Sequence, residues 1–165
     1  MLNKISEKSI FSRDISLIKK FSNEELKLYK YFHEKTTHFP ESVVIIDNFI
    51  FFFVKSHYYF SCSSYITSIR QEIPNKKVLI IRSEKTLIRQ IFSLFPDLYI
   101  HDVQIKGFNS KGIVVSVYIL TFKDRGIAIG REGSYIKAVN KLFNRAIKIQ
   151  ECDIIFELEC QVSIM

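Results

Sequence analysis

Residues 129–136 read Ile-Gly-Arg-Glu-Gly-Ser-Tyr-Ile, a glycine-x-x-glycine loop that opens a helical pattern. Glycine lacks Cβ and adopts positive φ readily, so two glycines three positions apart let a turn bring its main-chain N–H groups close to another molecule. A helix that begins directly afterwards adds unpaired N–H groups and a positive dipole end, which favour phosphate at the same place. A tight turn without a ligand is the alternative interpretation, and the flanking sequence decides between the two.

The flanking sequence predicts a defined order of elements around this loop. Upstream, Ser83 is expected to cap a helix that Pro96 ends, and two alternating apolar runs separated by residues 107–112 predict a β-hairpin. Downstream, apolar spacing predicts an amphipathic helix ending near Asn144, then a strand from Ile147. The apolar positions are Leu87, Ile88, Ile91, Phe92 and Phe95, then Val103, Ile105, Ile113, Val115, Val117 and Ile119, then Ile136, Val139 and Phe143. The predicted order is helix, strand, strand, loop-helix, strand.

This order and the loop resemble a bacterial-type (type II) KH domain, whose GXXG loop clamps about four nucleotides of RNA by their backbone. Residues 77–150 are most similar to the first KH domain of the NusA transcription factor family. The matching segments are 78–83, the helix that carries Ile88, Ile91 and Phe92, and then 96–97, 103–106, 111–117, 126–130 and 133–139. The resemblance implies an α+β fold with a three-stranded sheet packed by helices. It implies an RNA site at Ile129, Gly130, Arg131, Glu132, Gly133, Ser134, Lys137 and Lys141. It also implies that the RNA bases lie in an apolar groove near Ile127, Ile129 and Ile136. The alternative interpretation is that these isoleucines are core residues.

The sequence departs from the NusA pattern in three ways. An OB-type barrel precedes the KH domain in NusA, and here residues 41–83 predict only a small degenerate OB-like region, with short strands at 43–46, 49–54, 58–60, 65–69 and 77–81. No second glycine-x-x-glycine follows, so no second KH domain is predicted. Glu132 puts a carboxylate in the loop, where it repels phosphate, so the predicted RNA affinity is modest and salt-sensitive.

The predicted domains are a helical segment at 1–40, the OB-like region at 41–83 and the KH domain at 84–165. Ile15, Ile18 and Phe21 indicate a first short helix, and the capping box at residues 22–25 indicates a second one that carries Leu26, Tyr29 and Phe32. This segment either attaches to RNA polymerase, by analogy with NusA, or closes the core of the β region. At the other end, Glu151, Asp153, Glu157 and Glu159 alternate imperfectly with Ile154, Ile155, Phe156 and Leu158, which predicts a charged edge strand.

The charge of the chain favours an acidic partner. The net charge is +7, and residues 123–148 hold seven basic side chains against two acidic ones. Lys137, Lys141 and Arg145 recur every four residues, so they line one side of the predicted helix. A solvated lysine stripe is the alternative, but the adjacent loop favours RNA.

Other classes of function find little support in the residues. The chain has 47% hydrophobic residues, which disfavours disorder, and it has no apolar run of about 18 residues, so no membrane partner is predicted. Residues 49–54 predict a buried strand or a surface covered by a partner. Three separated cysteines and four scattered histidines indicate neither a disulfide nor a metal site, and no nucleophile or acid–base pair has the spacing of an enzyme. We therefore expect no enzyme activity and no cofactor.

The predicted function is binding of single-stranded RNA in transcription elongation, termination or antitermination, beside RNA polymerase. Two alternatives are a ribosome-associated KH protein on the small subunit and a degenerate KH domain that serves as a protein-interaction scaffold. The abundance of Ile, Phe, Lys and Asn indicates an AT-rich genome, which predicts a plastid or another organelle, or otherwise a bacterial cytoplasm.

Overall fold

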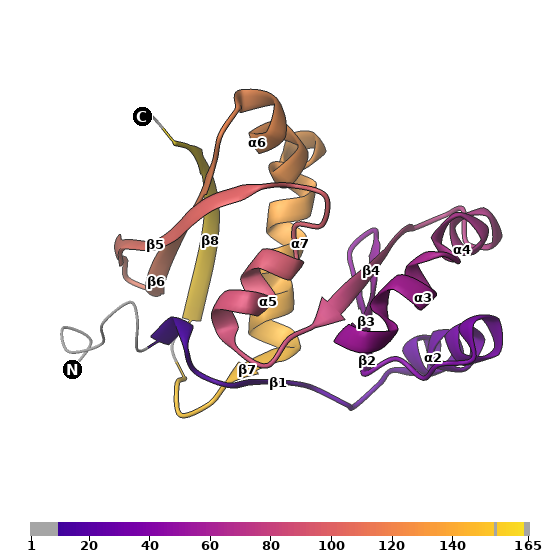
Figure 1. The fold of residues 1–165 in the computed structure, drawn as a ribbon. Coiled ribbons are helices and arrows are strands. Elements are labelled where there is room, and N and C mark those ends of the chain that lie inside the picture. Colours follow the sequence, from indigo (N-terminus) through magenta and orange to yellow (C-terminus); the bar gives the residue numbers. More distant parts are fainter. Residues whose placement is uncertain (1–9, 154, 164–165) are drawn as a thin grey trace. The chain divides into compact units, whose positions relative to one another are not determined.

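The structure, a computed structural model, describes residues 10–153 and 155–163 (Figure 1). The chain divides into two compact units, each with helices and its own three-stranded sheet. Unit 1 consists of residues 1–16 and 85–165, and unit 2 consists of residues 17–84. The protein therefore has a mixed α+β fold in which unit 2 is inserted between two segments of unit 1. The predicted boundary near residue 83 lies close to the observed one, whereas the predicted boundary at residue 40 falls inside unit 2.

Unit 2 is a small sheet covered by helices. Its elements are α2 (Asn23–Thr36), β2 (Ser42–Ile46), β3 (Phe49–Lys55), η2 (Ser56–Tyr58), α3 (Tyr59–Ser63), α4 (Ile66–Glu72) and β4 (Lys77–Ser83). The strand order is β2-β3-β4, with β2 and β3 antiparallel and β3 and β4 parallel. Phe32 of α2, Phe52 of β3 and Ile69 of α4 meet in its core. Every side chain from Phe49 to Val54 is buried, so the predicted buried strand at these positions is confirmed.

The capping box predicted at Ser22 is confirmed and has a second role. The Ser22 side chain accepts a bond from the Glu25 N–H, and the Glu25 carboxylate accepts one from the Ser22 N–H at 2.9 Å. The other Glu25 carboxylate oxygen accepts the Ile45 N–H at 2.8 Å. This buried carboxylate therefore starts α2 and also ties it to the edge strand β2. The alternative in which this helix closes the core of the β region agrees with its packing, because α2 contributes Phe32 to that core.

Several predictions for residues 1–83 were wrong. The strands expected at 58–60 and 65–69 are helical, and β2 and β4 are opposite edges of an open sheet, so unit 2 is not an OB-like barrel. Residues around Ile15 form the short strand β1 (Ile15–Leu17) and not a helix. The β-branched and aromatic residues of α3 and α4 favour strands locally, but they fold as helices whose Cys62 and Ile69 fill the core.

Unit 1 contains the loop. Its main elements are α5 (Leu87–Ser93), β5 (Ile100–Phe108), β6 (Gly112–Ile119), α6 (Phe122–Ile129), η3 (Arg131–Gly133), α7 (Ser134–Arg145), β7 (Ile147–Ile149) and β8 (Ile155–Val162). The predicted hairpin is confirmed as antiparallel β5 and β6, and β8 joins β6 in parallel as an edge strand. The amphipathic helix is confirmed as α7, which buries Val139, Leu142 and Phe143.

Four details of unit 1 differ from the sequence predictions. Ser83 ends β4, so α5 begins later, after Thr86, and Phe92 is 41% exposed. Helix α6 was not predicted. The strand predicted from Ile147 forms as β7 but pairs with β1 in a separate two-stranded sheet, and the third strand of the main sheet is β8. Ile154, which we expected in that acidic strand, lies outside the described residues.

The two units repeat one topology, which the sequence analysis did not predict. When the short elements η2, η3 and β7 are left out, each unit has the order helix, strand, strand, helix, helix, strand from its first long helix onward. In each sheet the first two strands are antiparallel, the second and third are parallel, and the strand order follows the sequence. The region expected to be a barrel relic is therefore a second copy of the arrangement that carries the loop.

Candidate nucleic-acid interface

The loop between α6 and α7 is a sharp bend in which three of the four residues 130–133 have positive φ. Gly130 has φ 81°, Glu132 has φ 56° and Gly133 has φ 72°. Arg131 and Glu132 are exposed at its tip, and Ser134 begins the 12-residue helix α7. The two glycines thus stand where positive φ is required, and the loop ends at a helix N-terminus, the geometry that favours an anion.

The main-chain N–H groups of the loop divide into two sets. Those of Gly130 and Gly133 are used internally, because they donate to Gly126 O at 3.0 Å and to Gly130 O at 3.1 Å. Within the described part of the chain, the N–H groups of Arg131 and Glu132 have no acceptor. The tip of the loop therefore presents two adjacent donors to solvent.

Tyr135 holds the loop against the rest of unit 1. It is buried, its hydroxyl donates to the main-chain oxygen of Leu94, and burial raises the pKa of this hydroxyl far above its ordinary value. A Cβ on Gly130 would lie 2.8 Å from both the N and Cβ atoms of Tyr135. Gly130 is therefore needed for close packing as well as for its backbone conformation.

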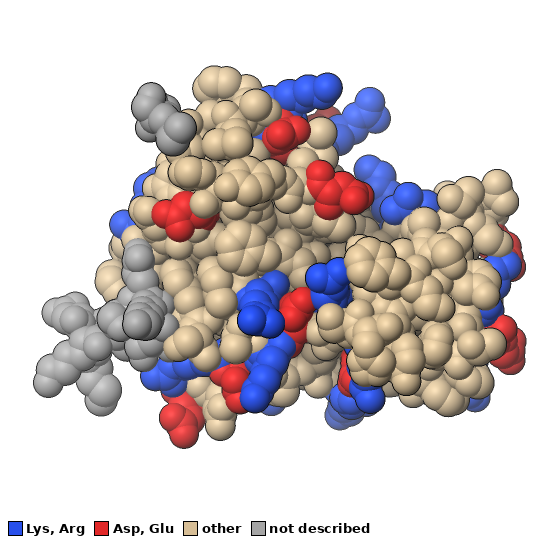
Figure 2. Space-filling model, viewed as in Figure 1, with Lys and Arg blue, Asp and Glu red and all other residues tan. Residues whose placement is uncertain are grey.

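Cationic side chains follow the loop along α7. Lys137 and Lys141 are exposed, and the Lys137 Nζ lies 3.4 Å from the main-chain oxygen of Glu132. Within the described residues, the Glu132 carboxylate forms no salt bridge. Figure 2 shows Lys and Arg side chains beside α6, with an acidic side chain among them. The positive charges of Lys137 and Lys141 thus oppose the negative charge of Glu132 near the loop, although Glu132 forms no ion pair among the described residues.

A groove continues from these lysines along α7. It encloses about 280 Å³ between α7, the start of β8 and the β5–β6 turn. Its polar and charged lining residues are Asn109, Lys111, Lys137, Asn140, Lys141, Asn144 and Glu157, and its apolar ones include Ile113, Ile155 and Phe156. We call this the unit 1 groove. It combines an apolar floor with cationic and amide side chains.

Two helix side chains cover part of the edge strand β8. The Asn140 amide bonds both main-chain groups of Leu158, at 3.1 Å to its oxygen and 2.7 Å from its nitrogen. The Arg125 Nε donates to Cys160 O at 2.8 Å. Arg125, counted in the basic segment, is therefore engaged with β8, and only part of that strand's outer edge remains available to a ligand.

All eight predicted site residues lie between the end of α6 and the second turn of α7, and each of them is exposed or half-buried. The apolar residues expected near the bases are not pure core, because Ile127 is 57% exposed and Ile129 and Ile136 are half-buried. Three lining residues of the unit 1 groove, Asn109, Lys111 and Asn140, were not predicted as site residues from the sequence. Asn109 accepts the N–H groups of Lys111 and Gly112 in an Asx turn, a pattern that Asn before glycine in a hairpin could have indicated.

The described residues meet the requirements of neither a metal site, nor a disulfide, nor a membrane-spanning helix. No group of three His, Cys, Asp or Glu side chains there is arranged to hold a metal ion. Cys62, Cys152 and Cys160 are free thiols, and burial raises the pKa of Cys160 to about 11. Within the same residues, no helix has the length and apolar character that crossing a membrane requires.

Comparison with known proteins gives a fold and no family. No protein-family model matches the chain. No curated protein matches it either. Among solved structures, the crystal structure of APE1850 matches with a TM-score of 0.62 and 18% sequence identity, over 86% of this chain and 100% of that chain. The match covers more of the chain than either unit contains, so it includes residues of both units and supports the fold alone.

Proposed function

We propose that unit 1 is a KH domain of the bacterial type that binds single-stranded RNA, and that the protein acts on transcripts as NusA-like factors do. The observation that carries the proposal is the loop at residues 130–133, which presents the free N–H groups of Arg131 and Glu132 at the start of α7. Those N–H groups are suited to bind one phosphate, and Lys137 and Lys141 attract the neighbouring phosphates of the same RNA strand. The topology of unit 1 and its groove support the same assignment, because a KH domain places bases beside the loop-helix unit.

The loop is best tested at its two exposed middle positions. Substituting Gly130 would confuse binding with folding, because its Cβ would collide with Tyr135. The pair Arg131→Asp and Glu132→Asp keeps the loop conformation, since Asp tolerates the left-handed region well. We expect RNA affinity to fall roughly tenfold or more, about 1.4 kcal/mol or more, because a carboxylate replaces the cation that meets phosphate.

The measurement is a fluorescence anisotropy titration with an RNA of roughly eight nucleotides, twice the four that such a loop clamps. Arg89→Asp, on the exposed side of α5, is the control with the same change of charge in the same unit. A folded loop variant that binds RNA as tightly as the control would disprove the clamp.

Glu132 favours a second candidate function, in which the domain is a scaffold for proteins. A carboxylate at the loop tip opposes phosphate, and 80% of the Phe122 side chain and 57% of the Ile127 side chain are exposed on α6 nearby in sequence. An affinity that is weak and insensitive to salt for every RNA tested would favour this scaffold. Cosedimentation with the small ribosomal subunit, and not with RNA polymerase, would favour the ribosome-associated alternative.

A further inference from the structure

Unit 2 contains a groove at the position that corresponds to the unit 1 groove. The parallel strands pair Gly112 with Ile155 in unit 1 and Phe49 with Lys77 in unit 2, so the start of β4 corresponds to the start of β8. A cavity of about 410 Å³ lies there, lined by Phe49, Arg70, Pro74, Lys76, Lys77, Val78 and Leu79. Phe49 belongs to the second strand, Arg70 to the second of the paired helices, and Lys77, Val78 and Leu79 to the third strand, while Pro74 and Lys76 lie on the connection between that helix and the third strand. The corresponding three elements line the unit 1 groove, together with the β5–β6 turn. We call this cavity the unit 2 groove.

The helix that borders each groove contacts the edge strand in a similar way. The sequence Ser-Tyr-Ile occurs at 64–66 and again at 134–136, and this alignment places Arg70 where unit 1 has Asn140. Arg70 donates to the Val78 main-chain oxygen from Nε at 3.2 Å and from Nη2 at 3.0 Å. A polar helix side chain thus covers the outer edge in both units, and in unit 2 it also brings a positive charge to the groove.

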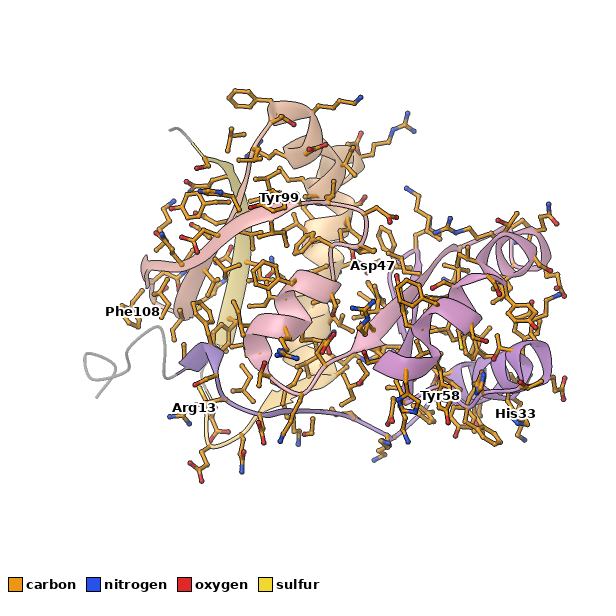
Figure 3. All side chains as sticks on the ribbon, viewed as in Figure 1. Arg13, His33, Asp47, Tyr58, Tyr99 and Phe108 are labelled. Atoms are coloured by element: carbon orange, nitrogen blue, oxygen red, sulfur yellow. The ribbon has the colours of Figure 1, made fainter. Side chains whose placement is uncertain are left out.

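The unit 2 groove is strongly cationic. Its charged lining residues are Arg70, Lys76 and Lys77, and no carboxylate is among the lining residues. The Lys77 Nζ lies 5.7 Å from the centre of the Phe49 ring, and the Lys76 Nζ donates to the Asp47 main-chain oxygen at 3.2 Å. Figure 3 marks Asp47, which lies on the β2–β3 turn, and Figure 2 shows basic side chains over the start of β4. The groove therefore suits a polyanion with flat apolar groups.

The loop, in contrast, is not repeated. At the junction of α3 and α4, Ser64 has φ −63° and Tyr65 has φ −92°, so the chain passes between the helices without a left-handed residue. All glycines of the chain lie in unit 1. Unit 2 cannot offer main-chain N–H groups as the loop of unit 1 does, and any phosphate there must be held by side chains.

We propose that the unit 2 groove is a second contact site for single-stranded RNA, held through phosphates by Arg70, Lys76 and Lys77 without a main-chain clamp. The choice of ligand rests on the function proposed for unit 1. RNA is favoured over an acidic protein segment because the unit 2 groove occupies the position that corresponds to the unit 1 groove. Both grooves combine lysine side chains with apolar lining residues. RNA bound at the unit 2 groove would then release counterions in addition to those that the loop accounts for.

The test removes the two lysine charges of the groove in the full chain, with Lys76→Gln and Lys77→Gln together. The probe is a single-stranded RNA several times longer than the footprint of one loop, titrated at a series of salt concentrations. We expect the salt slope of log affinity to become shallower by about 1.4, since each phosphate contact on a single strand contributes about 0.7. RNA should also protect Lys76 and Lys77 from acetylation in a mass-spectrometric footprint.

The matched control is Lys27→Gln with Lys30→Gln, two exposed lysines on α2, which packs on the opposite edge of the unit 2 sheet. We expect the control to keep the wild-type slope and RNA to leave Lys27 and Lys30 reactive. Equal slopes for the two pairs, or unprotected Lys76 and Lys77, would overturn the proposal.

The loop variant separates this proposal from the proposed function. If Arg131→Asp with Glu132→Asp weakens binding while the Lys76 and Lys77 pair behaves as the control, the clamp stands and the second site is wrong. If only the Lys76 and Lys77 pair changes the slope, the second site stands and the clamp is wrong. If the wild-type chain does not bind RNA but binds polyglutamate through Lys76 and Lys77, both RNA proposals are wrong and the occupant of the unit 2 groove is an acidic protein segment.

Discussion

Gly130 and Gly133 have similar φ values but different surroundings. Gly130 has ψ 172°, a region that is almost restricted to glycine, and an added Cβ would lie 2.8 Å from Tyr135 atoms. Gly133 has ψ 17°, in the left-handed helical region, and an added Cβ would make ordinary contacts at 3.7 Å. Only the first glycine is therefore required by packing as well as by conformation.

We expect Gly133→Ala to lower the free energy of unfolding by about 1–2 kcal/mol, the cost of the left-handed region for a residue with Cβ. Gly130→Ala should cost clearly more, because conformational strain of about 1–3 kcal/mol adds to the collision with Tyr135. Urea unfolding of the two variants measures the difference. Equal losses would mean that the loop moves away from Tyr135 without penalty.

At the level of elements, one carboxylate links all three strands of the unit 1 sheet. Glu159 of β8 accepts the Ser116 hydroxyl of β6 at 3.0 Å and forms an ion pair with Lys106 of β5 at 2.8 Å. Burial alone would raise the pKa of Glu159, but the bonds from Lys106, Ser116 and Gln161 outweigh it and lower this pKa below its ordinary value of 4.5. The charged form of Glu159 therefore stabilises the folded sheet.

Because the folded pKa is the lower one, this stabilisation is present above the unfolded pKa and is lost as the pH falls through the folded pKa. We expect Glu159→Gln, which keeps an acceptor for Ser116, to lower the midpoint of thermal unfolding slightly at pH 7. The difference from wild type should shrink below about pH 4.5. Thermal scans across this range test it, and a difference that persists in acid would show that the charge is not the cause.

At the scale of the whole molecule, unit 1 is assembled from two segments that unit 2 separates in the sequence. The Arg13 guanidinium donates to the main-chain oxygens of Gln150 and Glu151 at 3.1 and 2.9 Å; Arg13 is labelled in Figure 3. The Gln150 N–H donates to Asp14 O, and the Leu87 N–H donates to Arg13 O. Residues 10–16 thus join the start of α5 to the end of β7.

Removal of residues 1–16 should therefore destabilise unit 1 by several kcal/mol, about 1 kcal/mol for each hydrogen bond lost and more for the buried Ile10. Hydrogen exchange should become faster in α7 and β6 and stay unchanged at Ile50, Phe52 and Val54 of β3, which belong to the core cluster of unit 2. Arg13→Ala should give a smaller loss in the same direction. Uniform acceleration in both units would contradict this division.

Elements whose signals are local could be predicted from the amino-acid sequence. The glycine pair predicts the loop, the alternation on both sides of residues 107–112 predicts the hairpin, and the apolar spacing of α7 predicts the helix. Each signal depends only on residues that are close together in the sequence. The Ser22 capping box is local in the same sense.

Tertiary structure alone decided the partners of those elements. Residues 58–60 and 65–69 lie in helical segments despite their local preference for strands, because the helices place Cys62 and Ile69 in the core of unit 2. Strand β7 lies outside the main sheet and pairs with β1. The repeated topology leaves only a faint trace in sequence, the recurring Ser-Tyr-Ile, because many apolar side chains can fill equivalent core positions. The two grooves likewise depend on which strand forms the edge, and pairing between distant segments sets that choice.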